Sequence, residues 1–419
     1  MHICIFEDTA TRNFLPLVYF RPVYELRCGV MSLGEKITSS FPGTTSVYQV
    51  RPQLSELLAG ESHRMMVNRL PEDDIWFING RLIPDQGIID CVRRQRREST
   101  CFVQAGQIVL AFIKRRDLAR VLTGIVSDVV SSTTFAGFPT DEIVSDVFSY
   151  PWELVNCTAV EIERDFVRLK KSRKFHRKSG GGLSGIHILN KKDVVIGKDS
   201  VLKPGAVLDA TRGPIIIGSS ATVMSNAVIE GPAFIGNNSI IKAGARIYHG
   251  TSIGAHCKVG GEVEASVIQG FSNKQHDGFL GHSYLGSWVN IGADTNTSDL
   301  KNTYGTVKVY INGSQVDSES QFVGLYMGDH SKTGINTMFN SGTVAGVSCN
   351  VYGAGFPPKF IPSFSWGEPG ELVEYDLEKS LETARRVMAR RDVELTPAYE
   401  KIYRNVFHLT EHERRAAGH

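Results

Sequence analysis

Residues 217–264, IGSSATVMSNAVIEGPAFIGNNSIIKAGARIYHGTSIGAHCKVGGEVE, carry an aliphatic residue at every sixth position. A period of six fits neither a helix, whose faces repeat about every 3.6 residues, nor a single strand, which alternates every two. It is the hexapeptide repeat of a parallel β-helix, in which three hexads close one triangular coil. The aliphatic side chain points into the prism, and the small residue that often follows lets the backbone turn. The aliphatic residues in phase are Ile217, Val223, Ile229, Ile235, Ile241, Ile247, Ile253 and Val259.

The repeat extends beyond this stretch in both directions. Ile196, Leu202 and Leu208 keep the same count upstream, and the hexads resume at Met327 after a non-repeating insert over about 294–322. Residues 356–366 are aromatic, rich in proline and outside the repeat. A β-sandwich would instead need alternation with turn signals every 8–12 residues. Burial of eight aliphatic residues in one prism stabilises the fold by on the order of 12–24 kcal/mol, as an upper bound. The unbroken period of six therefore favours the β-helix over the sandwich.

Composition narrows the number of domains, the kinds of partner and the cellular compartment. A chain of 419 residues is long enough for two or three domains. Lys+Arg 46 against Asp+Glu 44 leaves a net charge of +2, which argues against a dedicated nucleic-acid binder. No apolar run approaches the roughly 18 residues that span a membrane, and the first residues lack a basic signal-peptide start. Seven scattered cysteines without a CxxC pair indicate a reducing cytoplasm and no zinc or disulfide framework.

The chain divides into three predicted parts. Residues 1–175 have the pattern of an α/β domain with an open sheet, whose ligands bind at the carboxyl ends of the strands. Residues 185–365 form the β-helix, and residues 370–419 form amphipathic helices that fold back over its coils or cover an open end. Strands are expected at 2–6, 74–78 and 108–113, and helices at 52–58, 117–122, 152–170, 377–388 and from Thr396 onward.

Catalysis on a β-helix needs a break in its regular coils, and residues 272–294, SNKQHDGFLGHSYLGSWVNIGAD, supply one. This break holds His276 and Asn290. A neutral imidazole is a natural general base near pH 7, and an asparagine amide can stabilise an oxyanion. No GxSxG nucleophile motif lies here, so the pattern favours direct transfer over a covalent intermediate.

The segment HDGFLGHSYLGSWVNIGAD resembles H-L-T-Y-L-G-D-A-E-I-G-D-N-V-N-I-G-A-G of the bifunctional N-acetylglucosamine-1-phosphate uridylyltransferase/glucosamine-1-phosphate acetyltransferase family. The resemblance implies a nucleotidyltransferase-like (Rossmann-like) domain, a left-handed β-helix and a homotrimer with acyl sites between neighbouring prisms. It implies that acetyl-CoA is the acyl donor and that His276 takes the proton from the sugar amine. It places Asn290 on a residue that contacts the sugar or acetyl group, Ala293 at the CoA site, and Glu262 on the preceding coil.

This segment and its flanking coils depart from the family at three positions. The family's tyrosine is Phe279 here, which removes a hydroxyl at the acyl-acceptor site. Glu264 stands where a lysine helps to bind the sugar phosphate, and Asp299 stands near the position of an asparagine. His282 matches a position that is not catalytic in the family, so we expect it to be structural. Acyl transfer is therefore expected, with the acceptor left open.

The N-terminal resemblance is weaker. The family opens with G-x-G-T-R…P…K-P, and this chain has IFEDTATRNFLPLVYFRP, in which Thr11-Arg12 matches T-R and Arg21 stands for the lysine. Asp8 and Ala10 replace the two glycines whose backbone N–H groups would wrap phosphates.

A second departure concerns the metal. The family's G-D, whose aspartate holds Mg²⁺, is Gly80-Arg81 here, so the usual carboxylate is missing and the metal is undefined. Arg12, Arg21 and Arg81 are candidate phosphate-binding residues. A domain that binds a sugar nucleotide without catalysis is the alternative.

Three functions stay open. The first is a cytoplasmic enzyme of nucleotide-sugar synthesis that makes or acylates an activated amino sugar, with sugar phosphate and nucleoside triphosphate or acyl-CoA as partners. The second is nucleotidyl transfer alone, with the β-helix as a trimerisation scaffold. The third is a non-catalytic protein that binds sugar nucleotides. The sequence specifies neither the sugar, the nucleotide base nor the acyl group.

Overall fold

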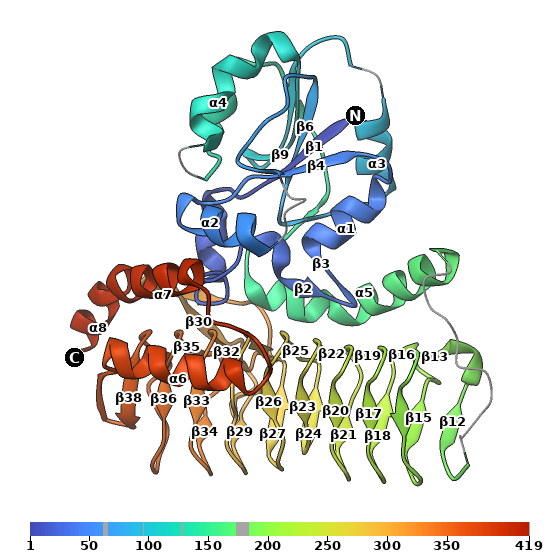
Figure 1. The fold of residues 1–419 in the computed structure, drawn as a ribbon, viewed down its shortest axis with the longest axis vertical. Helices are drawn as coiled ribbons and strands as arrows, with labels where there is room; N and C mark the ends of the chain where they lie inside the picture. The colour runs from blue at the N-terminus through green and yellow to red at the C-terminus, as the bar shows by residue number, and fades with distance from the viewer. Residues whose placement is uncertain (62–65, 95, 127–128, 173–183, 419) are drawn as a thin grey trace.

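The computed structural model describes residues 1–61, 66–94, 96–126, 129–172 and 184–418. An α/β domain lies over one flank of a prism of stacked short strands, and the C-terminal helices lie along the same prism (Figure 1). This is the predicted combination of an α/β domain, a hexapeptide β-helix and C-terminal helices. The expected boundary between 175 and 185 falls almost wholly on residues 173–183, outside the described residues.

The N-terminal domain is built on one mixed sheet with the strand order β10-β8-β9-β6-β1-β4-β5. Its central strand β1 (His2–Phe6) pairs in parallel with β4 (Thr45–Tyr48) and β6 (Ile75–Asn79), so the carboxyl ends of these three strands share one edge. The three strands and three helices predicted in this domain all have counterparts. The other strands are β2 (Arg27–Cys28), β3 (Met31–Ser32), β5 (Met66–Val67), β7 (Leu82–Ile83), β8 (Thr100–Gln104), β9 (Gln107–Ile113), β10 (Thr140–Glu142) and β11 (Asp146–Val147). The helices are α1 (Leu33–Ser40), α2 (Pro52–Glu61), α3 (Gln86–Arg93), α4 (Leu118–Val126) and α5 (Pro151–Ser172), and the 3₁₀ turn η1 (Thr9–Phe14) follows β1.

The prism has three faces of stacked short strands, parallel except for the last strand β39, and each face is named here by its first strand. The β12 face contains β12 (His187–Leu189), β15 (Val207–Asp209), β18 (Val228–Glu230), β21 (Arg246–Ile247), β24 (Glu262–Glu264) and β27 (Phe279–Gly281), and β29 (Asn296–Thr297) and β34 (Met338–Phe339) extend it. The β13 face contains β13 (Val194–Ile196), β16 (Ile215–Ile217), β19 (Ala233–Ile235), β22 (Thr251–Ile253), β25 (Val267–Ile268), β28 (Tyr284–Leu285), β32 (Leu325–Met327), β35 (Thr343–Ala345) and β37 (Phe360–Ile361). The β14 face contains β14 (Val201–Leu202), β17 (Thr222–Val223), β20 (Ile240–Ile241), β23 (Lys258–Val259) and β26 (Asn273–Lys274), then β33 (Lys332–Thr333), β36 (Asn350–Val351), β38 (Ser365–Glu368) and β39 (Glu371–Glu374).

The interior of the prism confirms the hexad prediction. All eight aliphatic residues of the deciding stretch are 0% exposed and belong to one apolar cluster. Their register is continuous, since Ile217 pairs with Ile235 and Ile235 with Ile253 in adjacent coils. Neighbouring strands about 4.8 Å apart therefore stack aliphatic side chains directly on one another.

Two boundaries and the helix count differ from the prediction. The insert begins later, because β29 still belongs to a coil; it forms the hairpin β30 (Lys308–Ile311) and β31 (Ser314–Asp317). Residues 356–366, predicted to leave the repeat, carry β37 and the start of β38, with Ile361 pairing in register with Ala345 inside the prism. A coil shortened from 18 residues to 16 hides this match from a hexad count. The chain ends in three helices, α6 (Leu377–Ala389), α7 (Pro397–Leu409) and the unpredicted α8 (Glu411–Ala417).

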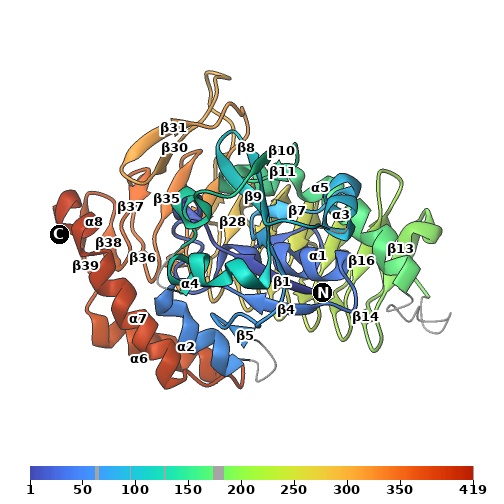
Figure 2. The same ribbon diagram turned by 90° about the horizontal axis from the view of Figure 1, so that it is seen from above.

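The α/β domain and the β13 face share one apolar core. Buried residues of the domain, of the β13 face and of α6–α7 belong to a single cluster, which includes Phe14, Tyr284 and Ile402. Helix α5 runs along the β13 face, and α2 packs against α7 (Figures 1 and 2). No helix among the described residues is long and apolar enough to cross a membrane.

Candidate functional sites

The loop after β1 contains an internal ion pair. Arg81 donates from Nε to Asp8 Oδ1 at 2.9 Å and from Nη2 to Asp8 Oδ2 at 2.5 Å. Its remaining donors reach the Phe148 carbonyl and Gln107 Oε1, and the Arg81 side chain is 0% exposed. The two positions that depart most from the family pattern are therefore bonded to each other. In this arrangement Arg81 neutralises Asp8 and presents no donor to a ligand.

This pair bears directly on a Mg²⁺ site. Both carboxylate oxygens of Asp8 accept hydrogen bonds from Arg81, and Asn79 Nδ2 also donates to Oδ2 at 2.8 Å. Within the described ranges, no group of three or more His, Cys, Asp or Glu side chains could hold a metal ion. Magnesium requires oxygen ligands that are free to coordinate, so the residues at the end of β1 do not fit it.

Arg21 lies at the junction between the domain and the prism. It donates to both carboxylate oxygens of Asp329, at 2.8 Å for Nη1–Oδ1, and from Nη2 to Ser287 Oγ at 3.0 Å. Arg21 is 8% exposed and Asp329 is 1% exposed. The structure thus places Arg21 in a buried bond that fastens two parts of the chain together.

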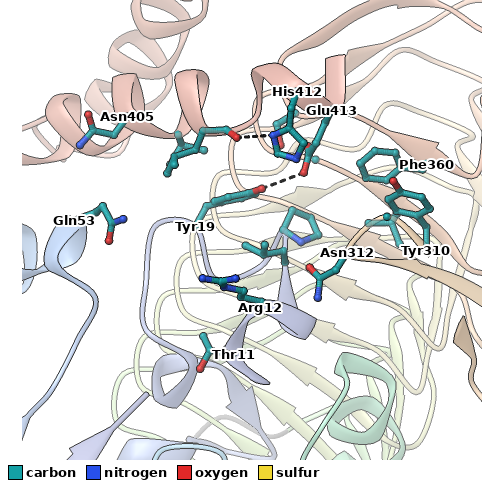
Figure 3. A pocket seen from close by; sticks show the side chains of 18 of the residues that line it. Thr11, Arg12, Tyr19, Gln53, Tyr310, Asn312, Phe360, Asn405, His412 and Glu413 are labelled. Carbon is teal, nitrogen blue, oxygen red and sulfur yellow. Dashed lines mark hydrogen bonds between the residues drawn. The ribbon is translucent and has the colours of Figure 1, made fainter. Parts of the chain in front are cut away.

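Arg12 is the predicted phosphate-binding residue that faces open space. It is exposed and lines a cavity of about 930 Å³ (Figure 3). One wall comes from η1 and the residues after it, and a second comes from the tip of the β30–β31 hairpin, with Asn312. A third wall comes from α7 and α8, with Asn405 and Glu413. Among the described residues, no carboxylate lies within ion-pair distance of Arg12, so its guanidinium is available to an anion.

The cavity combines this cation with polar and aromatic groups. Tyr19 donates its hydroxyl to Glu413 Oε1 at 3.3 Å, and burial raises the pKa of the Glu413 carboxyl. Tyr310 and Phe360 stack with ring centroids 4.0 Å apart on another side of the space. A guanidinium, amides and an aromatic platform in one concave space suit a phosphorylated sugar or a nucleotide.

The predicted acyl-transfer residues gather at one corner of the prism, between the β14 and β12 faces. His276 lies on the turn from β26 to β27, and Ala293 lies on the turn directly above, where Asp294 N donates to the Asp277 carbonyl at 3.1 Å. Glu262 and Phe279 are partners in register on the β12 side of this corner. Asn290 lies on the β14 side, where its Oδ1 accepts from Asn273 at 3.4 Å. The corner therefore brings five predicted residues from three consecutive coils together.

The His276 side chain is exposed at this corner, whereas the His282 side chain is held by contacts with its neighbours. His282 Nδ1 lies 2.8 Å from Asp299 Oδ2, and its ring stacks on Phe322. This agrees with the structural role expected for His282. Glu264, which replaces the family's phosphate-binding lysine, lies 4.0 Å from His249 Nδ1 on the neighbouring coil.

Lys274 is a further residue of this corner, one that motif reasoning did not assign. It occupies an inward position and is 2% exposed, and its Nζ donates to the carbonyls of Gly260 at 3.1 Å and His276 at 2.8 Å. Burial lowers the pKa of the amine to about 8, although Asp277 and Asp294 oppose that shift. In the sequence, Lys274 could have been recognised because it takes an inward position of the repeat that an aliphatic residue occupies in the neighbouring coils.

Comparison with known proteins agrees with this architecture. Residues 3–174 match the family model described as sugar nucleotidyl transferase. The N-terminal part of the chain is a sugar nucleotidyl transferase domain. Over part of its length the chain is also distantly homologous to bifunctional nucleotidyltransferase/acetyltransferases.

The curated relatives match only part of the chain. The bifunctional protein GlmU of Synechococcus sp. (strain CC9311) is 27% identical over 194 residues, 45% of this chain and 38% of the relative. The bifunctional sugar-1-phosphate nucleotidylyltransferase/acetyltransferase of Sulfurisphaera tokodaii is 32% identical over 147 residues, 34% of this chain and 36% of the relative. The chain thus spans little more than a third of the length of these curated relatives.

One solved structure that matches is the UDP-N-acetylglucosamine acyltransferase of Campylobacter jejuni. It is 12% identical, covers 53% of this chain and 94% of its own, and has a TM-score of 0.25.

Proposed function

We propose that this protein is an acyltransferase of nucleotide-sugar biosynthesis that uses acetyl-CoA to acylate the amine of an amino-sugar phosphate. The observation that carries the proposal is the corner at which exposed His276 lies beside Glu262, Phe279, Asn290 and Ala293. The proposed parts are an N-terminal domain over 1–175, an acyl-transferring β-helix over 185–365 and C-terminal helices over 370–419. The domain match and the bifunctional relatives support a transferase that handles activated sugars.

The chemistry at this corner is direct transfer. The sugar amine attacks the thioester carbonyl while His276 accepts the proton of the amine, so that an N–C bond forms and the C–S bond breaks. The imidazolium then returns the proton to the departing thiolate of CoA. The Asn290 amide is available to donate to the carbonyl oxygen as charge develops there. Phe279 supplies no hydroxyl, so this side of the acceptor site is apolar.

Replacement of His276 tests this assignment. His276→Ala should lower acyl transfer from acetyl-CoA to a panel of amino-sugar phosphates by about 10²–10⁴-fold. The matched control is His187→Ala, because His187 is likewise exposed but lies on β12 in the first coil, away from the corner. Thiol release from acetyl-CoA measures the rate. Equal turnover in wild type and His276→Ala would remove His276 as the base.

A second function is favoured by the cavity at Arg12. In that case the N-terminal domain binds or makes a sugar nucleotide, and the β-helix serves as a scaffold for oligomers. Pyrophosphate release from nucleoside triphosphate and sugar 1-phosphate, lost in Arg12→Ala, would support nucleotidyl transfer. Binding without turnover across the same panel would instead indicate a non-catalytic sugar-nucleotide sensor.

The proposal includes a cytoplasmic homotrimer. The trimer follows from the family resemblance, in which acyl sites lie between prisms, and sedimentation equilibrium of the full chain tests it. The cytoplasmic location rests on seven cysteines that are all free.

A further inference from the structure

Four cations meet on the β14 face at the end of helix α6. Lys258 is on β23, Lys242 directly follows β20, and Arg390 and Arg391 directly follow α6. Lys258 is in register with Asn273, and Arg391 donates to Asn273 Oδ1 at 2.8 Å and to the His256 carbonyl at 3.1 Å. These bonds hold the Arg391 guanidinium beside Lys258. Burial, together with the charges of Arg391, Lys242 and Arg390, lowers the pKa of Lys258, so the four groups lie within electrostatic range.

The cluster lacks a counter-charge. Across the described ranges, none of these four cations lies within ion-pair distance of a carboxylate, and Arg391 donates to two neutral acceptors, the His256 carbonyl and Asn273 Oδ1. Other arginines of the C-terminal helices are paired: Arg385 with Glu400 and Arg404 with Glu378. Unpaired like charges held at close range raise the free energy of the folded protein. An anion that binds there would remove this cost.

The cluster lies close to the proposed acyl-transfer corner. Gly260 directly follows β23 beside Lys242, and its position admits no side chain, because a Cβ there would lie 2.4 Å from the Gln275 carbonyl oxygen. From Asn273 the chain reaches His276 within three residues, so the cluster lies on the face that leads directly to the proposed acyl-transfer corner.

We propose that Lys242, Lys258, Arg390 and Arg391 form a binding site for the diphosphate group of a nucleotide ligand. Four cations in a compact patch match a doubly charged diphosphate better than a single carboxylate. A nucleoside diphosphate moiety occurs both in CoA and in a sugar nucleotide, and either could extend from this site toward His276. The inference rests on the proposed function only for the identity of that ligand.

Calorimetric titration of the full chain tests the site with three probes: pyrophosphate, CoA and UDP-N-acetylglucosamine. Lys242→Gln and Lys258→Gln should each weaken binding of pyrophosphate, and of whichever nucleotide uses the site, by about tenfold. Within the described part of the chain, neither lysine side chain makes a hydrogen bond, and the matched control is Lys203→Gln. Lys203 is exposed on the same face two coils before Lys242, away from α6.

The three probes distinguish a failure of the proposed diphosphate site from a failure of the proposed acyl donor. If wild type binds pyrophosphate and both variants lose that affinity, the anion site stands even when CoA does not bind and the acyl donor is wrong. If CoA binds equally to wild type and both variants, the proposed donor stands and the site is overturned. The absence of pyrophosphate and nucleotide binding by wild type also overturns it.

Discussion

Lys274 shows how one residue can depart from the repeat and still fit the fold. Its neighbours in register, Val259 and Ile291, fill the same inward column with aliphatic side chains. Lys274 instead brings an amine into the prism and directs it to two backbone carbonyls of the His276 corner. A buried ammonium loses hydration free energy, which explains the lowered pKa.

This residue makes stability depend on pH in the alkaline range. The pKa of Lys274 is lowered from 10.5 to about 8 in the folded protein. Between these values the unfolded chain binds more protons than the folded chain, so the free energy of unfolding rises with pH. The contribution of Lys274 to that rise is on the order of 3 kcal/mol. Urea unfolding of wild type and Lys274→Met from pH 7.5 to 10.5 measures it, with a steeper rise expected in wild type. Lys332, whose pKa burial also lowers to about 8, is present in both proteins and cancels from the difference. Parallel curves would contradict the prediction.

At the scale of the elements, the sequence predicted what depends on local periodicity. Eight hexads in phase specify the coils, and alternation of apolar and helical segments specifies the α/β domain. The last coil was not predicted, because its length of 16 residues breaks the period of six, although Ile361 still points inward. The His276 corner was predictable as well, because residues one coil apart stack. Asp8 and Arg81 were each recognised as departures, yet their bond depends on β1 and β6 lying side by side, with Phe6 in register with Asn79. Strand order is a long-range property that a period does not encode.

The stability of the protein should depend strongly on the Asp8–Arg81 ion pair at the ends of β1 and β6. Arg81→Met leaves the Asp8 carboxylate in a largely buried site without its partner, and the free energy of unfolding should fall by about 3–5 kcal/mol. Asp8→Asn combined with Arg81→Met should recover part of that loss, because neither charge remains. Urea unfolding of the two single variants and the double variant completes the cycle. Arg116→Met, which removes an exposed pair with Glu98, is the control and should cost at most about 1 kcal/mol. Additive losses in the double variant would contradict the assigned bond.

At the scale of the whole molecule, the three parts of the chain are fastened by shared apolar packing and a few buried polar bonds. Residues of the domain, the β13 face and α6–α7 belong to one core. The Arg21–Asp329 pair joins the domain to the coil above Ser287, and Ser252 Oγ donates to the Gly29 carbonyl at 2.6 Å. The cavity at Arg12 has walls from all three parts, so its shape depends on this docking. This arrangement could not be predicted from sequence patterns, because Arg21 and Asp329 are separated by 308 residues.

Removal of the Arg21–Asp329 bond should therefore loosen both sides of the junction together. Asp329→Ala leaves the Arg21 guanidinium 8% exposed and without its carboxylate, which should cost about 3–5 kcal/mol of stability. Hydrogen exchange should become faster in β1 of the domain and in β28 and β32 of the prism, because the shared core transmits the loss. Lys401→Ala is the matched control, since Lys401 and Glu56 also join distant parts of the chain, but through a pair that is 67% and 59% exposed. That control should change stability by less than about 1 kcal/mol. Faster exchange in the prism with β1 unchanged would show that the two parts open independently and that the junction does not couple them.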